Sequence, residues 1–287
     1  MTRAFIFTLA LEAALVICWS SGFIGAKLAS ETSAVFVILF WRFLFTSIAL
    51  LPSLWVAFQK GLTFKSFAVQ FLVGFLAMGV FLALGVKSID LGVPAGTSAL
   101  ISALQPLLTV AAASLILLEP ITARQWLGLA IGLVGVSVAV GGSLETAPFI
   151  AYLLAFVAVL AIVAATIVTK LFKEPLSILP TLSIQCIAAT LLFLPLSIFE
   201  GSLMPIVDSD FIFAILWFIL LSTIGAYGFY WICLGRSSTA RVSSLIYLTP
   251  PVTAVWAWLM FSEPISLAVL FGFVICFCGV MLAAKEN

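Results

Sequence analysis

Histidine is absent from this chain of 287 residues, and charged side chains make up only 8% of it. Without histidine the chain has no Ser-His-Asp or Cys-His nucleophile, no histidine ligand for zinc or haem, and no ordinary proton shuttle at neutral pH. The sequence GxxxxGK[ST], whose backbone binds nucleotide phosphates, is also missing. These absences exclude many classes of enzyme and any ATPase built on that phosphate-binding loop.

The chain also has few cysteines and almost no net charge. Its five cysteines lie inside apolar runs, at spacings that match neither a metal site nor a disulfide framework. The 12 Lys and Arg nearly balance the 11 Asp and Glu, so no basic patch or acidic tail predicts nucleic acid or a charged protein as a partner. We therefore expect no metal, no cofactor and no nucleic acid.

Hydrophobic residues, in contrast, are abundant at 64%, whereas a soluble domain has about 45–50%. Apolar runs of about 20 residues, the helical length that crosses about 30 Å of hydrocarbon, occur about ten times. Because a helix satisfies its own backbone hydrogen bonds in lipid, we predict an all-α membrane protein of ten transmembrane helices. The predicted spans are 5–27, 34–58, 66–86, 94–118, 123–142, 148–171, 177–199, 210–233, 240–261 and 265–284.

The positions of the cations predict the orientation of these spans. Lys and Arg accumulate in short cytoplasmic loops, and here they fall almost entirely on the side of the N-terminus. Only Lys27 and Lys87 fall on the other side. The first span contains Glu12 and has no small-residue cleavage site, so we interpret it as a retained helix and not a signal peptide. Both termini are predicted to be cytoplasmic.

The chain contains an internal repeat. The stretch LLEPITARQWLGLAIGLVGV at 117–136 recurs as FSEPISLAVLFGFVICFCGV at 261–280, an offset of 144. A weaker correspondence at an offset of 143 pairs Lys27 with Lys170 and Arg42 with Gln185. The chain thus divides into two five-helix repeats, 1–143 and 144–287. Because five is odd, the second repeat enters the membrane from the opposite side, and the two are predicted to be inverted.

Prolines interrupt corresponding spans of the two repeats. Pro106 lies near the middle of 94–118, and Pro250 with Pro251 lies near the middle of 240–261. A proline inside a helix frees the carbonyl four residues earlier, and polar backbone at this depth is tolerated when it lines a wet cavity. A kink whose carbonyl is bonded by a neighbouring hydroxyl is the alternative. The symmetric placement favours a central cavity, and hence a transporter.

Polar and aromatic residues at helical spacing predict the walls of that cavity. The alternative is that hydroxyls bond across helices and aromatic rings fill the core. The predicted substrate-binding residues are Trp19, Phe23, Lys27, Met78, Phe81, Ser102, Gln105, Thr109, Thr166, Tyr227, Tyr230, Tyr247 and Thr249. Walls of this kind suit a small, partly apolar solute with polar ends.

Charges within the spans are expensive in lipid and are therefore candidate functional groups. Glu12 either carries a coupling proton or extends to the cytoplasmic surface. Lys27 either binds a substrate carboxylate or anchors its helix among headgroups, whereas we expect Arg42 to tie helices together and not to meet substrate. Several glycines predict close packing between spans 123–142 and 265–284. They are Gly128, Gly132, Gly135, Gly272 and Gly279.

The runs WSSGFIGAKLA and WRF, with LQPLLTVAAASLILLEPITARQWLGLAIGLVGV and its second copy, resemble the EamA-type members of the drug/metabolite transporter superfamily. These ten-helix exporters include the YddG-like amino-acid exporters. The resemblance implies a bacterial inner-membrane protein that exports small metabolites by alternating access. It also singles out Lys27, Arg42, Glu119 and Glu263 as matching positions. The second repeat departs from the pattern by having Gln185 in place of arginine.

The leading hypothesis is a secondary exporter of small metabolites, with amino acids as the first candidates. A sugar-phosphate or nucleotide-sugar exchanger is disfavoured, because the predicted cavity lacks a Lys/Arg cluster for phosphate. A membrane-embedded lipid-modifying enzyme is disfavoured by the lack of a carboxylate cluster, and a channel would differ by showing no counterflow. We expect a monomer without enzymatic activity whose partners are a small-molecule substrate and membrane lipid.

Overall fold

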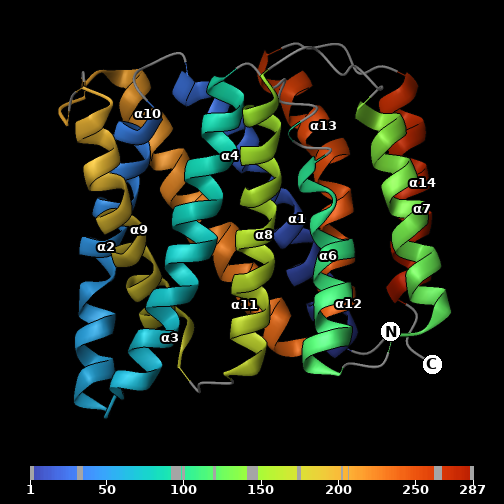
Figure 1. Cartoon of the computed structure of the whole chain (residues 1–287), viewed down its shortest axis with the longest axis horizontal. Helices are drawn as coiled ribbons and strands as arrows, with labels where there is room; N and C mark the ends of the chain where they lie inside the picture. Colours follow the sequence, from blue (N-terminus) through green and yellow to red (C-terminus); the bar gives the residue numbers. More distant parts are fainter. Residues whose placement is uncertain are drawn as a thin grey trace.

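The computed structural model describes residues 3–30, 35–91, 98, 101–118, 121–140, 148–172, 176–201, 203–205, 207–261 and 267–284. Every regular element in these residues is a helix, and the helices stand side by side in one bundle (Figure 1). Six of them are long and apolar enough to cross a membrane, and shorter apolar helices cover 105–117 and 270–279. The prediction of an all-helical membrane protein is confirmed, while the count of ten spans stays a prediction.

The described part of the first repeat contains three long helical rods and two shorter ones. The elements are α1 (Arg3–Ser30), α2 (Val35–Gln59), α3 (Phe64–Gly74), the π-helix η1 (Phe75–Val80), α4 (Phe81–Asp90), α6 (Gln105–Ala112), the π-helix η2 (Ala113–Leu117) and α7 (Ala123–Val140). Thr63 starts α3 by accepting a hydrogen bond from the Ser66 N–H at 3.1 Å. Gly61, with φ of +88°, makes the preceding turn possible because it has no Cβ.

The second repeat follows the same order. Its elements are α8 (Phe149–Leu171), α9 (Ile178–Phe199), α10 (Ser209–Trp217), the π-helix η3 (Phe218–Tyr227), α11 (Gly228–Arg236), α12 (Thr239–Leu245), the 3-10 helix η4 (Ile246–Leu248), α13 (Thr249–Phe261) and α14 (Leu267–Ala284). Asp208 caps α10 by accepting a hydrogen bond from the Phe211 N–H at 2.8 Å. An acidic N-cap suits the positive end of the helix dipole.

Packing between the repeats follows the predicted twofold symmetry. Helix α2 packs on its equivalent α9, and α7 packs on its equivalent α14. Two further contacts are related by the same symmetry. Helix α1 packs on η3, and its equivalent α8 packs on η1 and α4 of the first repeat. In Figure 1, α2 descends and α9 rises, so these equivalent helices run in opposite directions. This arrangement supports an inverted relation between the repeats.

Both predicted interruptions are present, and each restarts a helix at an equivalent residue. Helix α6 begins at Gln105 after a turn at 103–104, and α13 begins at Thr249 after η4. The prolines therefore lie in first turns, where a missing N–H costs no helical hydrogen bond. The π-helices η1 and η3 also begin at equivalent residues, Phe75 and Phe218. The sequence analysis did not anticipate them, because a π-turn has no composition signal.

Glycines bring α7 and α14 into backbone contact, as predicted. A Cβ on Gly279 would lie 2.6 Å from the carbonyl oxygen of Gly128 and 2.7 Å from the backbone nitrogen of Gly132. Neither atom can rotate away, since both belong to the helix backbone. The contact between these helices therefore requires a residue without a side chain at position 279.

We predict that Gly279→Ala lowers the free energy of unfolding by about 1–3 kcal/mol, because the added methyl forces the two helices apart. Thermal unfolding of the purified protein in detergent measures the effect as a lower melting temperature. Gly228→Ala is the matched control, since its new Cβ would only touch Leu182 at 3.8 Å. Equal melting temperatures for the two variants would contradict the close approach.

Candidate functional site

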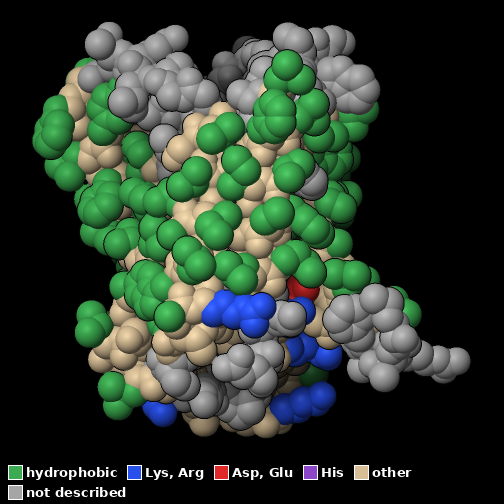
Figure 2. Space-filling model, turned by 90° about the vertical axis from the view of Figure 1, so that its right-hand side faces the viewer, with side chains coloured by type: hydrophobic (Ala, Val, Ile, Leu, Met, Phe, Trp, Pro, Cys, Tyr) green, Lys and Arg blue, Asp and Glu red, His purple; other side chains and the backbone are tan. Residues whose placement is uncertain are grey.

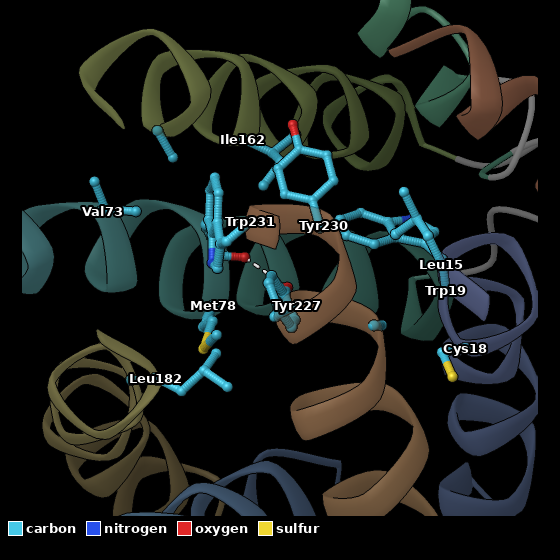
Figure 3. Packing of buried hydrophobic residues seen from close by; sticks show 14 of the residues in the cluster. Leu15, Cys18, Trp19, Val73, Met78, Ile162, Leu182, Tyr227, Tyr230 and Trp231 are labelled. Atoms are coloured by element: carbon cyan, nitrogen blue, oxygen red, sulfur yellow. Dashed lines mark hydrogen bonds between the residues drawn. The ribbon is translucent and has the colours of Figure 1, made fainter. Parts of the chain in front are cut away.

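Four aromatic side chains form a buried layer at the centre of the bundle, where the two repeats meet (Figure 3). We call this set the aromatic partition: Trp19 of α1, Tyr227 of η3, and Tyr230 and Trp231 of α11. The ring centroids of Trp19 lie 5.5 Å from Tyr227 and 5.0 Å from Tyr230. Tyr230 and Trp231 meet edge to face at 4.7 Å. Each side chain is less than a tenth exposed.

Hydrogen bonds fix the tyrosines of the aromatic partition. The Tyr227 hydroxyl donates to the carbonyl oxygen of Ala77 in η1 at 2.7 Å, the dashed line in Figure 3. The Tyr230 hydroxyl lies 2.6 Å from the Thr166 hydroxyl of α8. Because Thr166 donates its own proton to the Ile162 carbonyl at 2.8 Å, Tyr230 is the donor of this pair. The bond of Tyr227 joins the π-helix of the second repeat to that of the first.

Trp231 is held by two amide side chains. Its indole N–H donates to Oε1 of Gln185 in α9 at 2.8 Å, and Nε2 of Gln185 donates to Oε1 of Gln70 in α3 at 2.9 Å. Close packing supports this contact, since a Cβ on Gly74 would lie 2.3 Å from the Cα of Gln185. The aromatic partition is therefore bonded to helices of both repeats.

A cavity of about 90 Å³ lies on one side of the aromatic partition. We call it the upper cavity, because it lies toward the helix ends at the top of Figure 1, where α2 begins and α4 ends. Its walls are mainly apolar and include one cation. The lining residues used below are Trp19, Phe23, Arg42, Phe81, Ser102, Ser222 and Tyr227.

A larger cavity of about 680 Å³ lies on the opposite side of the partition. We call it the lower cavity, because it lies where α8 ends and α9 begins, at the bottom of Figure 1. Its lining is more polar than that of the upper cavity. The lining residues used below are Gln70, Lys170, Thr181, Gln185, Trp231 and Arg236. Its volume is within the range of about 300–1,000 Å³ that is typical of small-molecule sites.

The two cavities are counterparts in the internal repeat. Four residues of α2 line the upper cavity, and for three of them the residue 143 positions later in α9 lines the lower cavity. The pairs are Val35 with Ile178, Ile38 with Thr181, and Arg42 with Gln185. An inverted repeat places equivalent residues at opposite depths. Each repeat thus supplies the same surface to a cavity on a different side of the partition.

The structure brings five of the predicted binding residues together in the upper cavity. They are Trp19, Phe23, Phe81, Ser102 and Tyr227. Met78, Thr166 and Tyr230 lie directly behind this lining in the buried core, each with no exposed surface. The side chain of Lys27 lies outside the residues whose side chains the structure describes.

The remaining predicted residues lie on the two interrupted rods. Gln105 is 1% exposed, and its Nε2 makes no hydrogen bond with the described residues; neither does the buried Oγ1 of Thr109. Tyr247 packs away from the upper cavity, against Gly132 of α7. Thr249 donates to the Ile246 carbonyl at 2.7 Å, so one freed carbonyl is satisfied by a neighbouring hydroxyl.

Comparison with known proteins shows the family. The sequence profile of the EamA-like transporter family matches residues 6–141 and again residues 149–285. The chain belongs to the EamA-like transporter family. The two matches confirm that it is built from two repeats of this family, while the exact division between residues 143 and 144 stays a prediction.

A solved structure described as "Crystal structure of protein" has the same fold as this EamA-like transporter. It superposes with a TM-score of 0.80 at 16% identity, covering 98% of this chain and 97% of the other. In all, 29 solved chains match significantly. No curated protein sequence matches. At this identity the likeness shows the fold alone.

Some lining residues of this EamA-like transporter were missed by the sequence analysis. Gln70 and Trp231 line the lower cavity, and Ser222 lines the upper one. The position of Trp231 beside the predicted stripe of Tyr227 and Tyr230 was a usable signal. Gln70 gave only the weak signal of an amide within an apolar run.

Glu12, the candidate for proton coupling, forms a salt bridge in this EamA-like transporter. Its Oε1 lies 2.6 Å from Nε of Arg241, and its Oε2 lies 3.2 Å from Nη2. The side chain of Glu12 is 7% exposed and that of Arg241 is 23% exposed. This bidentate pair joins α1 to α12. Extension to the cytoplasmic surface was one of the two alternatives for Glu12, and the structure gives this carboxylate an internal partner.

We predict that Glu12→Gln lowers the free energy of unfolding by roughly 1–3 kcal/mol. Removing one partner of a fully buried pair costs about 3–5 kcal/mol, and the partial exposure of Arg241 reduces that cost. Unfolding of Glu12→Gln, Arg241→Gln and the double variant in detergent forms a double-mutant cycle. The double variant should lose less than the sum of the single losses. Additive losses would mean that the ion pair contributes no stability.

Proposed function

We propose that this protein is a secondary transporter that exports small metabolites by alternating access, with amino acids as the first candidate substrates. The observation that best supports this proposal is the pair of repeat-equivalent cavities on opposite sides of the aromatic partition. A carrier needs one substrate path that opens to either side in turn. Two copies of one bundle that exchange conformations provide such a path.

The aromatic partition favours a carrier over a channel. Tyr227 borders the upper cavity and Trp231 borders the lower one, so bonded side chains of the partition separate the two spaces. Passage of a solute requires the bonds of Tyr227 and Trp231 to break. Each bond is worth about 1 kcal/mol net, which is small enough for repeated opening.

The lining supports a small, partly apolar substrate. Trp19, Phe23 and Phe81 offer aromatic surface in the upper cavity, and Ser102 and Ser222 offer hydroxyls. A phosphate group binds best to several cations, and Arg42 is the one cation among the described residues that line the upper cavity. Lys170 and Arg236 line the lower cavity, so sugar phosphates stay the alternative substrate class. In the described part of the chain, no group of three or more His, Cys, Asp or Glu residues supports a metal-dependent lipid enzyme.

The proposed location is a bacterial inner membrane, with both termini in the cytoplasm. Figure 2 shows Lys and Arg side chains gathered at the lower end of the face formed by α7 and α14, below a hydrophobic surface. The termini lie at the same lower end in Figure 1. The positive-inside rule places this end in the cytoplasm. The upper cavity then faces the outside and the lower cavity the inside.

Glu12 is the proposed proton carrier, if transport is driven by a pH gradient. Protonation would remove its charge and break the pair with Arg241, which joins α1 to α12. Since Trp19 also belongs to α1, loosening this helix would affect the aromatic partition. The salt bridge is the contact through which a change in the charge of Glu12 would act on α1 and α12.

We predict opposite labelling of two cysteines if the proposed orientation is right. With the five native cysteines replaced by alanine, Ser209→Cys should react with an impermeant maleimide added to intact cells. Lys60→Cys should react only after the cells are opened. Ser209 and Lys60 are both exposed and lie at opposite ends of the bundle. Labelling of Lys60→Cys in intact cells would reverse the orientation.

We predict saturable counterflow of an amino acid in proteoliposomes, and a weaker apparent affinity after Gln105→Leu. The Gln105 amide is buried without a hydrogen bond from its Nε2, so a polar substrate that reaches it gains a donor. Loss of the hydrogen bond from this amide should weaken the binding free energy by about 1–3 kcal/mol, which lowers the affinity about tenfold. Labelled leucine, measured against unlabelled internal leucine together with a panel of other amino acids, provides the assay.

Leu192→Ala is the control for this experiment, because Leu192 of α9 borders neither cavity. It should leave the affinity unchanged. Wild-type affinity for Gln105→Leu would place the substrate elsewhere. Flux that never saturates and shows no counterflow would indicate a channel and would overturn the carrier proposal.

A further inference from the structure

Arg42 is a buried cation in the wall of the upper cavity. It lies about two turns from the start of α2, inside a helix that is apolar enough to cross a membrane. Only 1% of its surface is exposed. An ionisable side chain at such a position is expensive and therefore needs a compensating partner.

The partners that the structure gives to Arg42 are all neutral. Its Nε donates to the Thr223 hydroxyl at 2.7 Å, and its Nη2 donates to the Ser222 hydroxyl at 3.0 Å. The guanidinium carbon lies 4.7 Å from the ring centroid of Phe43 and 4.6 Å from that of Phe218. These contacts tie α2 to η3. They do not neutralise the charge.

Within the residues that the structure describes, no carboxylate pairs with Arg42. The ion pairs found there are those of Lys87 with Asp90 and Arg241 with Glu12. Two of the five N–H donors of the guanidinium bond Thr223 and Ser222, which leaves three without a hydrogen-bond acceptor. The upper cavity is the open space beside them.

We propose that Arg42 binds the carboxylate group of the transported solute in the upper cavity. A carboxylate supplies the missing negative charge and matches the planar guanidinium with two parallel hydrogen bonds. The rings of Phe43 and Phe218 hold the guanidinium in place. The apolar part of the solute then packs against Phe23 and Phe81. The inference thus names the substrate class, small monocarboxylates including amino acids, and it rests on the proposed function.

The second repeat does not duplicate this anchor. Gln185, the counterpart of Arg42 in the lower cavity, is neutral and already bonds Trp231 and Gln70 with its two amide ends. The cation that can pair with a carboxylate at this repeat position is therefore confined to the upper cavity. The cations that line the lower cavity, Lys170 of α8 and Arg236 of α11, come from other repeat positions.

The test compares two probes of the same shape that differ in charge, isovalerate and isovaleramide. Calorimetry on the purified full-length protein in detergent measures the binding of each. The wild-type protein should prefer isovalerate by about tenfold or more, as charge-assisted hydrogen bonds require. Arg42→Gln should reduce the ratio of the two affinities to about one. Arg42→Lys keeps the charge but loses the planar guanidinium that donates two parallel hydrogen bonds, so it should retain part of the preference.

Ser47→Ala is the matched control on the same helix, since Ser47 is buried against Thr190 of α9 and away from the upper cavity. It should keep the full preference for isovalerate. A wild-type preference near one would overturn the proposal without the need for any variant. A folded Arg42→Gln variant that still prefers isovalerate as strongly as the wild type would also overturn the proposal. If Arg42→Gln does not fold, an Arg42→Lys variant with the wild-type preference for isovalerate would overturn it.

The outcomes for binding and for transport are separable. Saturable counterflow of a neutral solute, with no preference for isovalerate, would contradict carboxylate binding by Arg42 but would still support the transporter proposal. A clear preference for isovalerate without counterflow of any solute would uphold the carboxylate site and overturn transport as its use.

Discussion

The whole structure depends on one constraint, that a polar group placed within lipid must find its partner inside the protein. The helices satisfy the backbone in this way, and many hydroxyls bond the carbonyl four residues earlier on the same helix. Ser20 bonds the Val16 carbonyl at 2.7 Å, and Thr190 bonds the Cys186 carbonyl at 2.8 Å. Polar side chains can therefore lie within apolar spans without requiring a ligand.

The informative side chains are the exceptions to that rule. Among the buried side-chain atoms without hydrogen bonds are Nε2 of Gln105, Oγ1 of Thr109 and Oγ1 of Thr253. Thr109 and Thr253 are repeat equivalents on the two interrupted rods, α6 and α13. Arg42 adds a buried charge whose partners are neutral, in the wall of the upper cavity. These polar groups belong to helices of both repeats, as expected for a path between the repeats that takes polar solutes.

The two repeats share a backbone plan but differ in chemistry. The interruptions and the starts of the π-helices η1 and η3 recur at equivalent residues, so this plan was kept after the duplication. The side chains diverged. The repeat equivalent of Arg42 is the neutral Gln185, and the repeat equivalent of Trp19 is Ile162, a buried core residue. A symmetric scaffold allows access from both sides, while unlike side chains allow the two cavities to treat a solute differently.

The sequence alone determined the helical membrane class, the two repeats, the interruptions at Pro106 and Pro250, and the glycine contact of α7 with α14. Each rests on hydropathy or on local spacing, which lipid and backbone sterics convert directly into structure. The site was predicted only in part. Trp19, Phe23 and Tyr227 reach the upper cavity, whereas Tyr247 packs against α7.

Only the tertiary structure decided which side chains meet. Tyr227 and Tyr230 both contact Trp19, yet the Tyr227 hydroxyl bonds the Ala77 carbonyl of η1, whereas the Tyr230 hydroxyl bonds Thr166 of α8. The contacts of the aromatic partition and the neutral surroundings of Arg42 join residues far apart in the sequence, 150 positions for Tyr227 with Ala77 and 181 for Arg42 with Thr223. Such contacts depend on how each helix is rotated and on what its neighbours leave open, and neither property is encoded in any single stretch of sequence.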